Sequence, residues 1–366
     1  MTTLFKFLIS AAVCAYSTQV LHAEDTKLPY WKDIQTVAVN KEYPRTAFMT
    51  YDNRNQALTG EYENSPYYKL LNGTWNFYYA DAYKDLPANI EQPDANIAWK
   101  EIKVPGNWEV QGYGVAIYTN HGYEFKPRNP QPPQLPETNP VGVYQRDIEI
   151  PADWDGRDIF LRLEGAKSGV YVYVNGQEVG YSEDNYLKPG KNSLVIKIFR
   201  WSTGSYLECQ DFWRMSGIER DVFLFSQPKT HIKDFNVVST LDDTYKNGIF
   251  KLNVDVTNHT AANKEVTVAY ELLDAAKKVV AEGNTPCPVT ADGQKSISFE
   301  AALSNVKTWT SEHPNLYRLL ISLKDGEKTS EIIPYTVGFR QKRQTIRLLV
   351  RQRPTHQAER CKHTRT

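Results

Sequence analysis

The chain has 366 residues, and its 43 Lys and Arg balance its 43 Asp and Glu, so the formal net charge is zero. Charged residues make up 23% and aromatic residues 12%, with 23 tyrosines, 20 glycines and 20 prolines. This composition excludes a disordered chain and a membrane chain, and it favours short strands joined by turns. The length allows two or three domains with ordinary hydrophobic cores.

The first 23 residues have the features of an export signal. Lys6 precedes an apolar stretch from Phe7 to Val13, and Ala23 stands directly before an acidic start. We therefore expect residues 1–23 to be a signal peptide and the product to be secreted, either periplasmic or extracellular. The alternative, a short buried helix, is disfavoured because the segment has no polar face.

The remaining sequence gives no sign of a membrane span or of a cysteine framework. Beyond the signal, no apolar run approaches the ~20 residues that a transmembrane helix needs. The four cysteines, Cys14, Cys209, Cys287 and Cys361, are widely spaced and contain no Cys-x-x-Cys unit. Neither a disulfide scaffold nor a zinc site is indicated, and we expect a soluble product.

Residues 24–227 are expected to form a jelly-roll β-sandwich. Apolar and polar residues alternate with period two in the stretches 160–164, 170–174 and 194–198, which indicates strands. Asn175-Gly176 follows the second stretch and supplies two residues that accept positive φ, so it predicts a tight hairpin turn. Regular short strands between turns are typical of a sandwich.

Residues 228–340 are expected to form a second, immunoglobulin-like sandwich. The alternation resumes in the stretches 250–256 and 266–272 after a boundary at Ser226-Gln227-Pro228. The length of this block is near the ~100 residues of an immunoglobulin-like domain. The predicted fold class is therefore all-β, with two sandwiches in succession.

Several sequence motifs occur in a fixed order along both blocks. They include Leu71-Asn72-Gly73-Thr74-Trp75, Val104-Pro105-Gly106-Asn107-Trp108, Tyr118-Thr119-Asn120, the run from Arg200 to Ile218, and Gly338-Phe339-Arg340. In these motifs the chain resembles family 2 glycoside hydrolases, and within that family the β-galactosidase branch. The resemblance implies a sugar-binding domain followed by the first immunoglobulin-like domain of such an enzyme.

The resemblance assigns substrate-binding roles to two residues. By motif position Asn120 and Asp211 would contact galactose hydroxyls, and Asp211 would also meet a sodium ion. A carboxylate suits both tasks, because it accepts hydrogen bonds from hydroxyls and is a hard oxygen ligand. A magnesium site, which the family implies for full-length enzymes, is in doubt here because Thr203 and Cys209 stand where relatives often carry Asp.

The same residues also have ordinary structural interpretations. Asn120 could cap a turn, and Asp211 could pair with Arg214 or Arg200. Four tryptophans could stack on a sugar, but a tryptophan inside a strand pattern is more often part of the core. We expect a core position for Trp75 and a rim or core position for the other three, which are Trp108, Trp201 and Trp213.

The catalytic groups of the family are not expected in this chain. A retaining glycosidase needs two carboxyl groups ~5 to 5.5 Å apart. In the family both belong to a barrel that follows Gly-Phe-Arg, and such a barrel takes ~250 residues. Residues 341–366 follow that motif here, so we expect a non-catalytic N-terminal part, truncated before both glutamates and inactive by itself.

Residues 341–366 differ in composition from the rest of the chain. They contain eight Lys and Arg but a single acid, Glu359, and no glycine. A metal site formed by His356, Glu359 and His363 lacks any supporting periodicity, and a basic nucleic-acid arm is only slightly better supported. We interpret the segment as an aberrant, disordered tail produced by a reading-frame shift, and we expect no nucleic-acid partner.

A second departure lies between Gly180 and Asn192. Relatives carry further residues at this point, including a strand. Loss of that strand would open a sheet edge, which is a liability for aggregation.

Three functions remain open at this stage. The first is the front part of a β-galactosidase, and the second is a stand-alone secreted module that binds a β-galactoside or another oligosaccharide. The third is an interaction protein with a basic tail. The sequence specifies no membrane partner and no oligomeric state.

The composition of the tail generates a first prediction. Because residues 341–366 lack an apolar period and glycine turns, we expect them to contribute no packing. A chain that ends at Arg340 should have the same melting temperature as the full chain in differential scanning calorimetry. A drop of several degrees would show instead that the tail packs on a sandwich.

Overall fold

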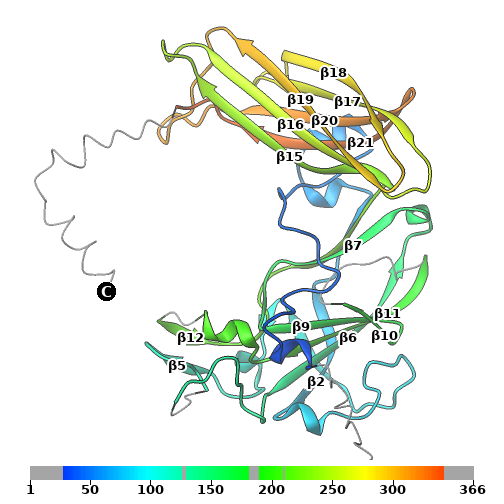
Figure 1. The fold of residues 1–366 in the computed structure, drawn as a ribbon, viewed down its shortest axis with the longest axis vertical. Helices are drawn as coiled ribbons and strands as arrows, with labels where there is room; N and C mark the ends of the chain where they lie inside the picture. The colour runs from blue at the N-terminus through cyan, green and yellow to red at the C-terminus, as the bar shows by residue number, and fades with distance from the viewer. Residues whose placement is uncertain (1–27, 126–128, 181–188, 209–210, 342–366) are drawn as a thin grey trace, which may run out of the picture.

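The computed structural model describes residues 28–125, 129–180, 189–208 and 211–341. The expected signal peptide and all but the first residue of the expected tail lie outside these ranges. Nearly all regular structure is β (Figure 1), as the alternating pattern predicts. No helix within the described part of the chain combines the length and apolar character needed to span a bilayer.

The described residues up to 227 form fourteen strands. They are β1 (Tyr68–Leu70), β2 (Gly73–Ala80), β3 (Lys100–Val104), β4 (Gly106–Asn107), β5 (Ile117–Thr119), β6 (Val141–Ile150), β7 (Asp158–Leu163), β8 (Ala166–Lys167), β9 (Gly169–Val174), β10 (Gln177–Gly180), β11 (Gly190–Phe199), β12 (Phe212–Arg214), β13 (Gly217–Ile218) and β14 (Val222–Gln227).

The described residues from 228 to 341 form seven longer strands. They are β15 (Thr230–Leu241), β16 (Gly248–Asn258), β17 (Lys264–Leu273), β18 (Val279–Val289), β19 (Gly293–Leu303), β20 (Tyr317–Asp325) and β21 (Lys328–Val337). The helices are short: α1 (Arg54–Ala57) and the 3₁₀ turns η1 (Tyr30–Lys32), η2 (Tyr62–Asn64), η3 (Tyr83–Asp85), η4 (Glu109–Gln111), η5 (Ala152–Trp154) and η6 (Thr203–Tyr206).

The first sandwich packs a six-stranded sheet on a three-stranded sheet. The strand orders are β10-β9-β11-β6-β2-β3 and β1-β14-β7, and all pairs are antiparallel. The core between the sheets contains Trp75, Phe77 and Ile196. Two small sheets, β12-β5 and β4-β13-β8, complete this half of the molecule. The sequence prediction of an all-β sandwich is therefore confirmed.

The individual strand predictions also agree with the structure. The stretches 160–164, 170–174 and 194–198 lie largely or wholly within β7, β9 and β11. Asn175 and Gly176 have φ angles of 51° and 80° and connect β9 to β10, so the hairpin prediction is confirmed. Both residues need left-handed backbone, which Asn and Gly adopt at low cost.

The second sandwich is more regular. Its sheets have the orders β15-β16-β19 and β18-β17-β20-β21. In β16 the side chains of Phe250, Leu252, Val254 and Val256 are all fully buried, while the residues between them face outward. This is the period-two pattern that a sheet with one buried face requires.

A shared apolar cluster joins the two sandwiches to the N-terminal segment. Its buried members come from three parts of the chain: Met49, Tyr51 and Ala57, then Phe160, Phe223 and Phe225, and finally Leu273, Leu320 and Ile332. The backbones of Tyr51 and Ile332 exchange hydrogen bonds of 2.9 and 2.7 Å. Burial of this much apolar surface fixes the sandwiches to each other.

A buried carboxylate lies beside this junction. Glu331 of β21 accepts hydrogen bonds from the backbone N–H of Ile232 at 2.8 Å and from Gln227 Nε2 at 2.7 Å. Its side chain is fully buried, and burial raises its pKa to about 7 against the opposing effect of these two donors. The carboxylate thus connects the last residue of β14 to the second sandwich.

The raised pKa of Glu331 predicts a pH dependence of stability. The preference of the folded state for protonated Glu331 adds to the free energy of unfolding. This addition is complete below the ordinary glutamate pKa and is lost as the pH rises through about 7. Between pH 5 and pH 8 the free energy of unfolding of the natural chain should fall relative to Glu331→Gln by up to about 3 kcal/mol. Any pH-independent change in the free energy of unfolding that the glutamine amide causes cancels, because only the pH dependence is compared.

Urea denaturation at several pH values measures this effect. The exposed Glu300, paired with Lys251 on the surface, provides the control Glu300→Gln, whose pH curve should run parallel to that of the natural chain. Parallel curves for Glu331→Gln as well would contradict the assignment.

Candidate functional site

The two candidate residues lie at one end of a short ribbon. In the β5-β12 pair Thr119 lies opposite Phe212 and Ile117 opposite Arg214. Asn120 follows β5 directly and Asp211 precedes β12 directly, so they leave the ribbon at the same end, and both are exposed. Both residues therefore lie on one rim of the first sandwich.

Asp211 is held by a tyrosine rather than by an arginine. Tyr118 Oη donates a hydrogen bond of 2.8 Å to Asp211 Oδ1, and this bond raises the pKa of the Tyr118 phenol. The two arginines considered as partners point elsewhere, since Arg200 meets two glutamates and Arg214 Nη1 donates to the carbonyl of Glu208. The carboxylate keeps further acceptor sites for an exposed ligand.

Aromatic side chains stand next to this carboxylate. The rings of Tyr118 and Trp213 meet edge to face at 5.6 Å, and each side chain is 54% exposed. Sugar rings bind where an apolar aromatic face adjoins hydrogen-bonding groups, because they expose both C–H and O–H groups. The sequence motifs include Tyr118, but they gave no signal that it orients Asp211.

The four tryptophans considered for stacking fall into different environments. Trp75 is buried in the first core, as predicted, and Trp108 is fully buried beside Phe77. Trp201 is half-buried. Trp213 is the member of this set whose ring is largely exposed, and it lies on the ribbon with the candidate residues.

A buried guanidinium ties the ribbon to the sandwich. Arg200 follows β11 and is 3% exposed. Its Nη2 donates to the carbonyl oxygen of Val115, just before β5, at 3.0 Å and to that of Arg214, at the end of β12, at 3.2 Å. One side chain therefore contacts the chain at the base of both ribbon strands.

Two buried glutamates neutralise this arginine. Glu109 Oε1 lies 3.4 Å from Arg200 Nη1, and Glu124 Oε2 lies 3.4 Å from Arg200 Nε. Glu109 also accepts from the Ser216 N–H at 2.9 and 3.1 Å, and Glu124 meets Lys167 Nζ at 3.3 Å. Burial raises the pKa of Glu109, although Ser216 and Arg200 oppose this. Because both side chains are buried and paired, neither offers a carboxylate to a sugar.

One cluster of possible metal ligands among the described residues was not predicted from the sequence. Ligand atoms of Asp158, His231 and His259 lie within 4.8 Å of one another. Asp158 is already paired with Lys229 and with His259 Nδ1, the latter at 2.7 Å. His231 Nδ1 lies 2.7 Å from the Pro228 carbonyl and must donate its proton there, so this nitrogen has no lone pair for an ion. The cluster is a polar contact between the sandwiches.

Comparison with known proteins identifies the family. Residues 68–228 match the sugar-binding domain of glycosyl hydrolases family 2, and residues 230–340 match a second domain of the same family. The chain belongs to glycosyl hydrolase family 2. The family resemblance drawn from the sequence motifs is therefore confirmed.

Curated relatives in this family are β-galactosidases. The chain is 34% identical over 328 residues to a β-galactosidase of Priestia megaterium, covering 85% of this chain and 32% of that protein. It is 36% identical over 296 residues to one of Psychromonas ingrahamii, covering 75% of this chain and 28% of that protein. The chain thus spans about a third of the length of these relatives.

Solved structures of the family share the fold at low sequence identity. A Bacteroides uniformis β-glucuronidase aligns with a TM-score of 0.59 and 17% identity over 74% of this chain and 32% of that chain. A protein described as a putative β-galactosidase from Bacteroides fragilis aligns with a TM-score of 0.55 and 17% identity. The alignment covers 74% of this chain and 40% of that chain. At this identity the likeness concerns the fold alone.

The Arg200 network generates a prediction about stability. Arg200→Gln leaves Glu109 and Glu124 buried without their common partner, which should lower the free energy of unfolding by ~3 to 5 kcal/mol. Arg54 forms a partly exposed pair with Glu271 at 2.7 Å, so the control Arg54→Gln should cost only ~0 to 1 kcal/mol. Urea denaturation measures both values. Similar losses in the two variants would refute the structural role of Arg200.

Proposed function

We propose that this chain is the non-catalytic, substrate-facing front part of a retaining β-galactosidase. In this proposal Asn120 and Asp211 contribute hydrogen bonds to a terminal β-galactoside. The observation that carries it is the ribbon geometry, which sets an exposed amide and an exposed carboxylate at one end of β5-β12, beside Tyr118. The match to curated β-galactosidases supports the substrate class.

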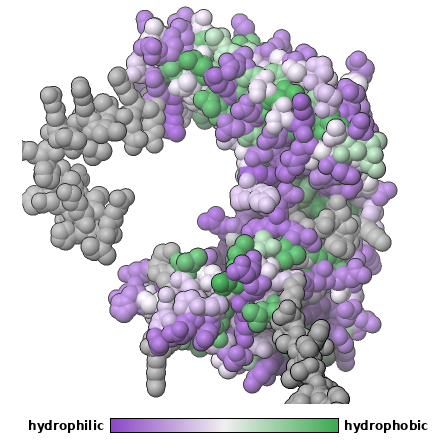
Figure 2. All heavy atoms as spheres, viewed as in Figure 1, coloured by the Kyte–Doolittle hydropathy of each residue, from purple (hydrophilic) through white to green (hydrophobic). Residues whose placement is uncertain are grey.

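The position of the ribbon also supports this proposal. Figure 1 shows β5 and β12 at the left of the lower sandwich, and Figure 2 shows a recess between the two sandwiches on that side. A further domain that carries a catalytic carboxylate pair would meet Asn120 and Asp211 if it filled this recess. The pair itself is proposed to belong to the part of the relatives that this chain does not match.

A cation is part of the proposal at Asp211. A sodium ion takes several oxygen ligands, and the described ribbon offers the Asp211 carboxylate with the Asn120 amide oxygen nearby. These residues fit part of a ligand shell, so the remaining ligands would come from sugar, water or the neighbouring domain. The proposal assigns no magnesium ligand to the described residues. It places the protein outside the cytoplasm because of the expected signal peptide.

A second function is supported by the exposed aromatic pair. Tyr118 and Trp213 form a solvent-facing ring surface that could bind an oligosaccharide without any chemistry, as a stand-alone secreted carbohydrate-binding module does. The two functions differ in the affinity that they predict, because a complete binding module needs no neighbouring domain.

A galactose titration followed by NMR separates the two functions. An isolated rim makes few hydrogen bonds, each worth ~0.5 to 1.5 kcal/mol net. The dissociation constant should therefore be millimolar or weaker, which corresponds to a binding free energy of at most ~4 kcal/mol. Asp211→Ala should weaken binding further, and the exposed control Asp243→Ala should not. Micromolar binding abolished by Asp211→Ala would favour the binding module.

An activity assay tests the non-catalytic assignment directly. The purified chain should hydrolyse nitrophenyl β-galactoside no faster than buffer, because the proposal assigns the catalytic carboxylate pair to the part of the relatives that this chain does not match. Steady turnover that is lost on substitution of a residue within this chain would refute the proposal.

A further inference from the structure

A cavity of about 360 Å³, here called the junction cavity, lies between the N-terminal segment and the second sandwich. The segment is bonded to β21 through Tyr51 and Ile332, and the cavity lies beyond this bridge, beside residues 334–336. Phe48 and Tyr51 are buried at its base, whereas Tyr335 is 37% exposed at its mouth. The lining is therefore aromatic and can be reached from solvent.

Arg318 supplies the positive charge of the junction cavity. It faces outward from the second sandwich, because its neighbours Tyr317 and Leu319 on β20 point into the core. Gly60 leaves room for the guanidinium, since a Cβ at this position would lie only 2.9 Å from Arg318 Nη1. Burial raises the pKa of Tyr51 to about 12, and the charge of Arg318 opposes this rise. The guanidinium thus lies close to both Gly60 and the Tyr51 phenol.

The guanidinium of Arg318 has no acidic partner among the described residues. Glu271 shares the outer face of the sheet with Arg318, since it lies opposite Leu320 in the register of β17 and β20. Its carboxylate is engaged by Arg54 at 2.7 Å. The described residues form no hydrogen bond with Arg318 either, and its side chain is partly buried. A partly buried charge is costly unless it is paired, so these free donors favour a negatively charged ligand.

We propose that the junction cavity binds a compact ring that carries a carboxylate. The planar guanidinium of Arg318 matches a carboxylate with two parallel hydrogen bonds. The Thr336 hydroxyl, directly opposite on β21, is a further donor. The aromatic side chains of Phe48, Tyr62 and Tyr335 line the cavity and contact the ring. The volume lies at the lower end of ordinary ligand pockets, so the ligand is small.

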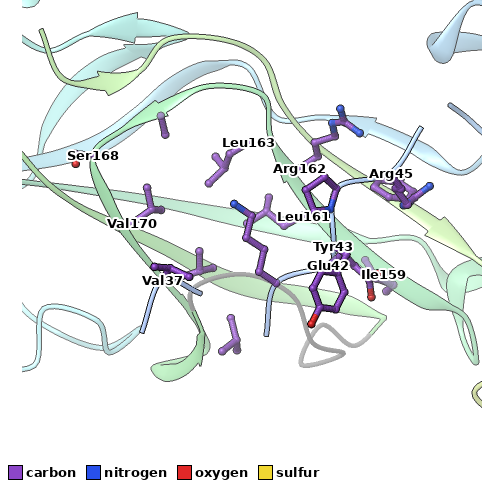
Figure 3. A pocket seen from close by; sticks show the side chains of 16 residues that line it. Val37, Glu42, Tyr43, Arg45, Ile159, Leu161, Arg162, Leu163, Ser168 and Val170 are labelled. Atoms are coloured by element: carbon purple, nitrogen blue, oxygen red, sulfur yellow. The ribbon is translucent and has the colours of Figure 1, made fainter. Parts of the chain in front are cut away.

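A second cavity differs in its lining. It has a volume of about 540 Å³, lies beside β7 and is lined by aliphatic side chains such as Leu161 and Val170 (Figure 3). Its two arginines, Arg45 and Arg162, already have polar partners in the protein. A ligand that seeks apolar surface alone would bind there, so this cavity supplies a control.

Titration of the full chain with benzoate, followed by NMR, tests this inference. Benzoate should bind saturably, and benzamide, which has the same shape without the charge, should bind at least tenfold more weakly. Arg318→Gln should weaken benzoate binding at least tenfold. Arg318→Lys keeps the charge but not the planar fork, so its effect should be intermediate. A parallel titration with glucuronate separates an aromatic acid from a sugar acid, because the tighter ligand identifies the ring.

The exposed Arg340, whose guanidinium lies over the Trp309 ring outside the cavity, provides the matched control. Arg340→Gln should leave benzoate binding unchanged, and so should Val170→Ala in the cavity beside β7. Equal affinity for benzoate and benzamide, or unchanged binding in Arg318→Gln, would overturn the proposal. Loss of binding in Val170→Ala alone would place the ligand beside β7 and overturn it as well, as would the absence of saturable binding of either acid.

Discussion

The ribbon that carries the candidate residues depends on one buried cation. Strands of three residues have little stability of their own, because a short two-stranded pair is marginal in water. Arg200 supplies stability that further strands would otherwise give. Its guanidinium donates hydrogen bonds to the backbone carbonyls of Val115 and Arg214, at the base of the two ribbon strands. The charge is tolerated in the interior because Glu109 and Glu124 share it. The exposed positions of Asn120 and Asp211 follow from this buried contact.

The junction between the sandwiches fixes the surroundings of that ribbon. The apolar cluster around Tyr51 and Ile332 holds the two bodies together, and Glu331 adds directional hydrogen bonds to Ile232 and Gln227. Directional bonds restrict rotation in a way that apolar contact alone does not. The recess beside the ribbon is therefore a stable feature of the surface, which the proposed site shared with a further domain would need.

Local patterns predicted the strands and failed for the long-range polar contacts. Alternation in 250–256 and the Asn175-Gly176 pair specify a strand and a turn through interactions between near neighbours. Arg200 and Glu124 are 76 residues apart, and no local pattern shows that they meet. The order of motifs singled out Asn120 and Asp211, but it could not show that Tyr118 would hold the carboxylate in place of an arginine.

The separation of the ribbon strands along the chain has a consequence for folding. Tyr118 and Asp211 are 93 residues apart, and closing a loop of that length costs on the order of 4 kcal/mol of chain entropy before any contact forms. Two strands of three residues cannot offset this cost, so the ribbon forms only after β6, β9 and β11 have already brought their ends together. The sugar recognition proposed for Asn120 and Asp211 would consequently be a property of the completed sandwich, which nascent or partly folded chains lack.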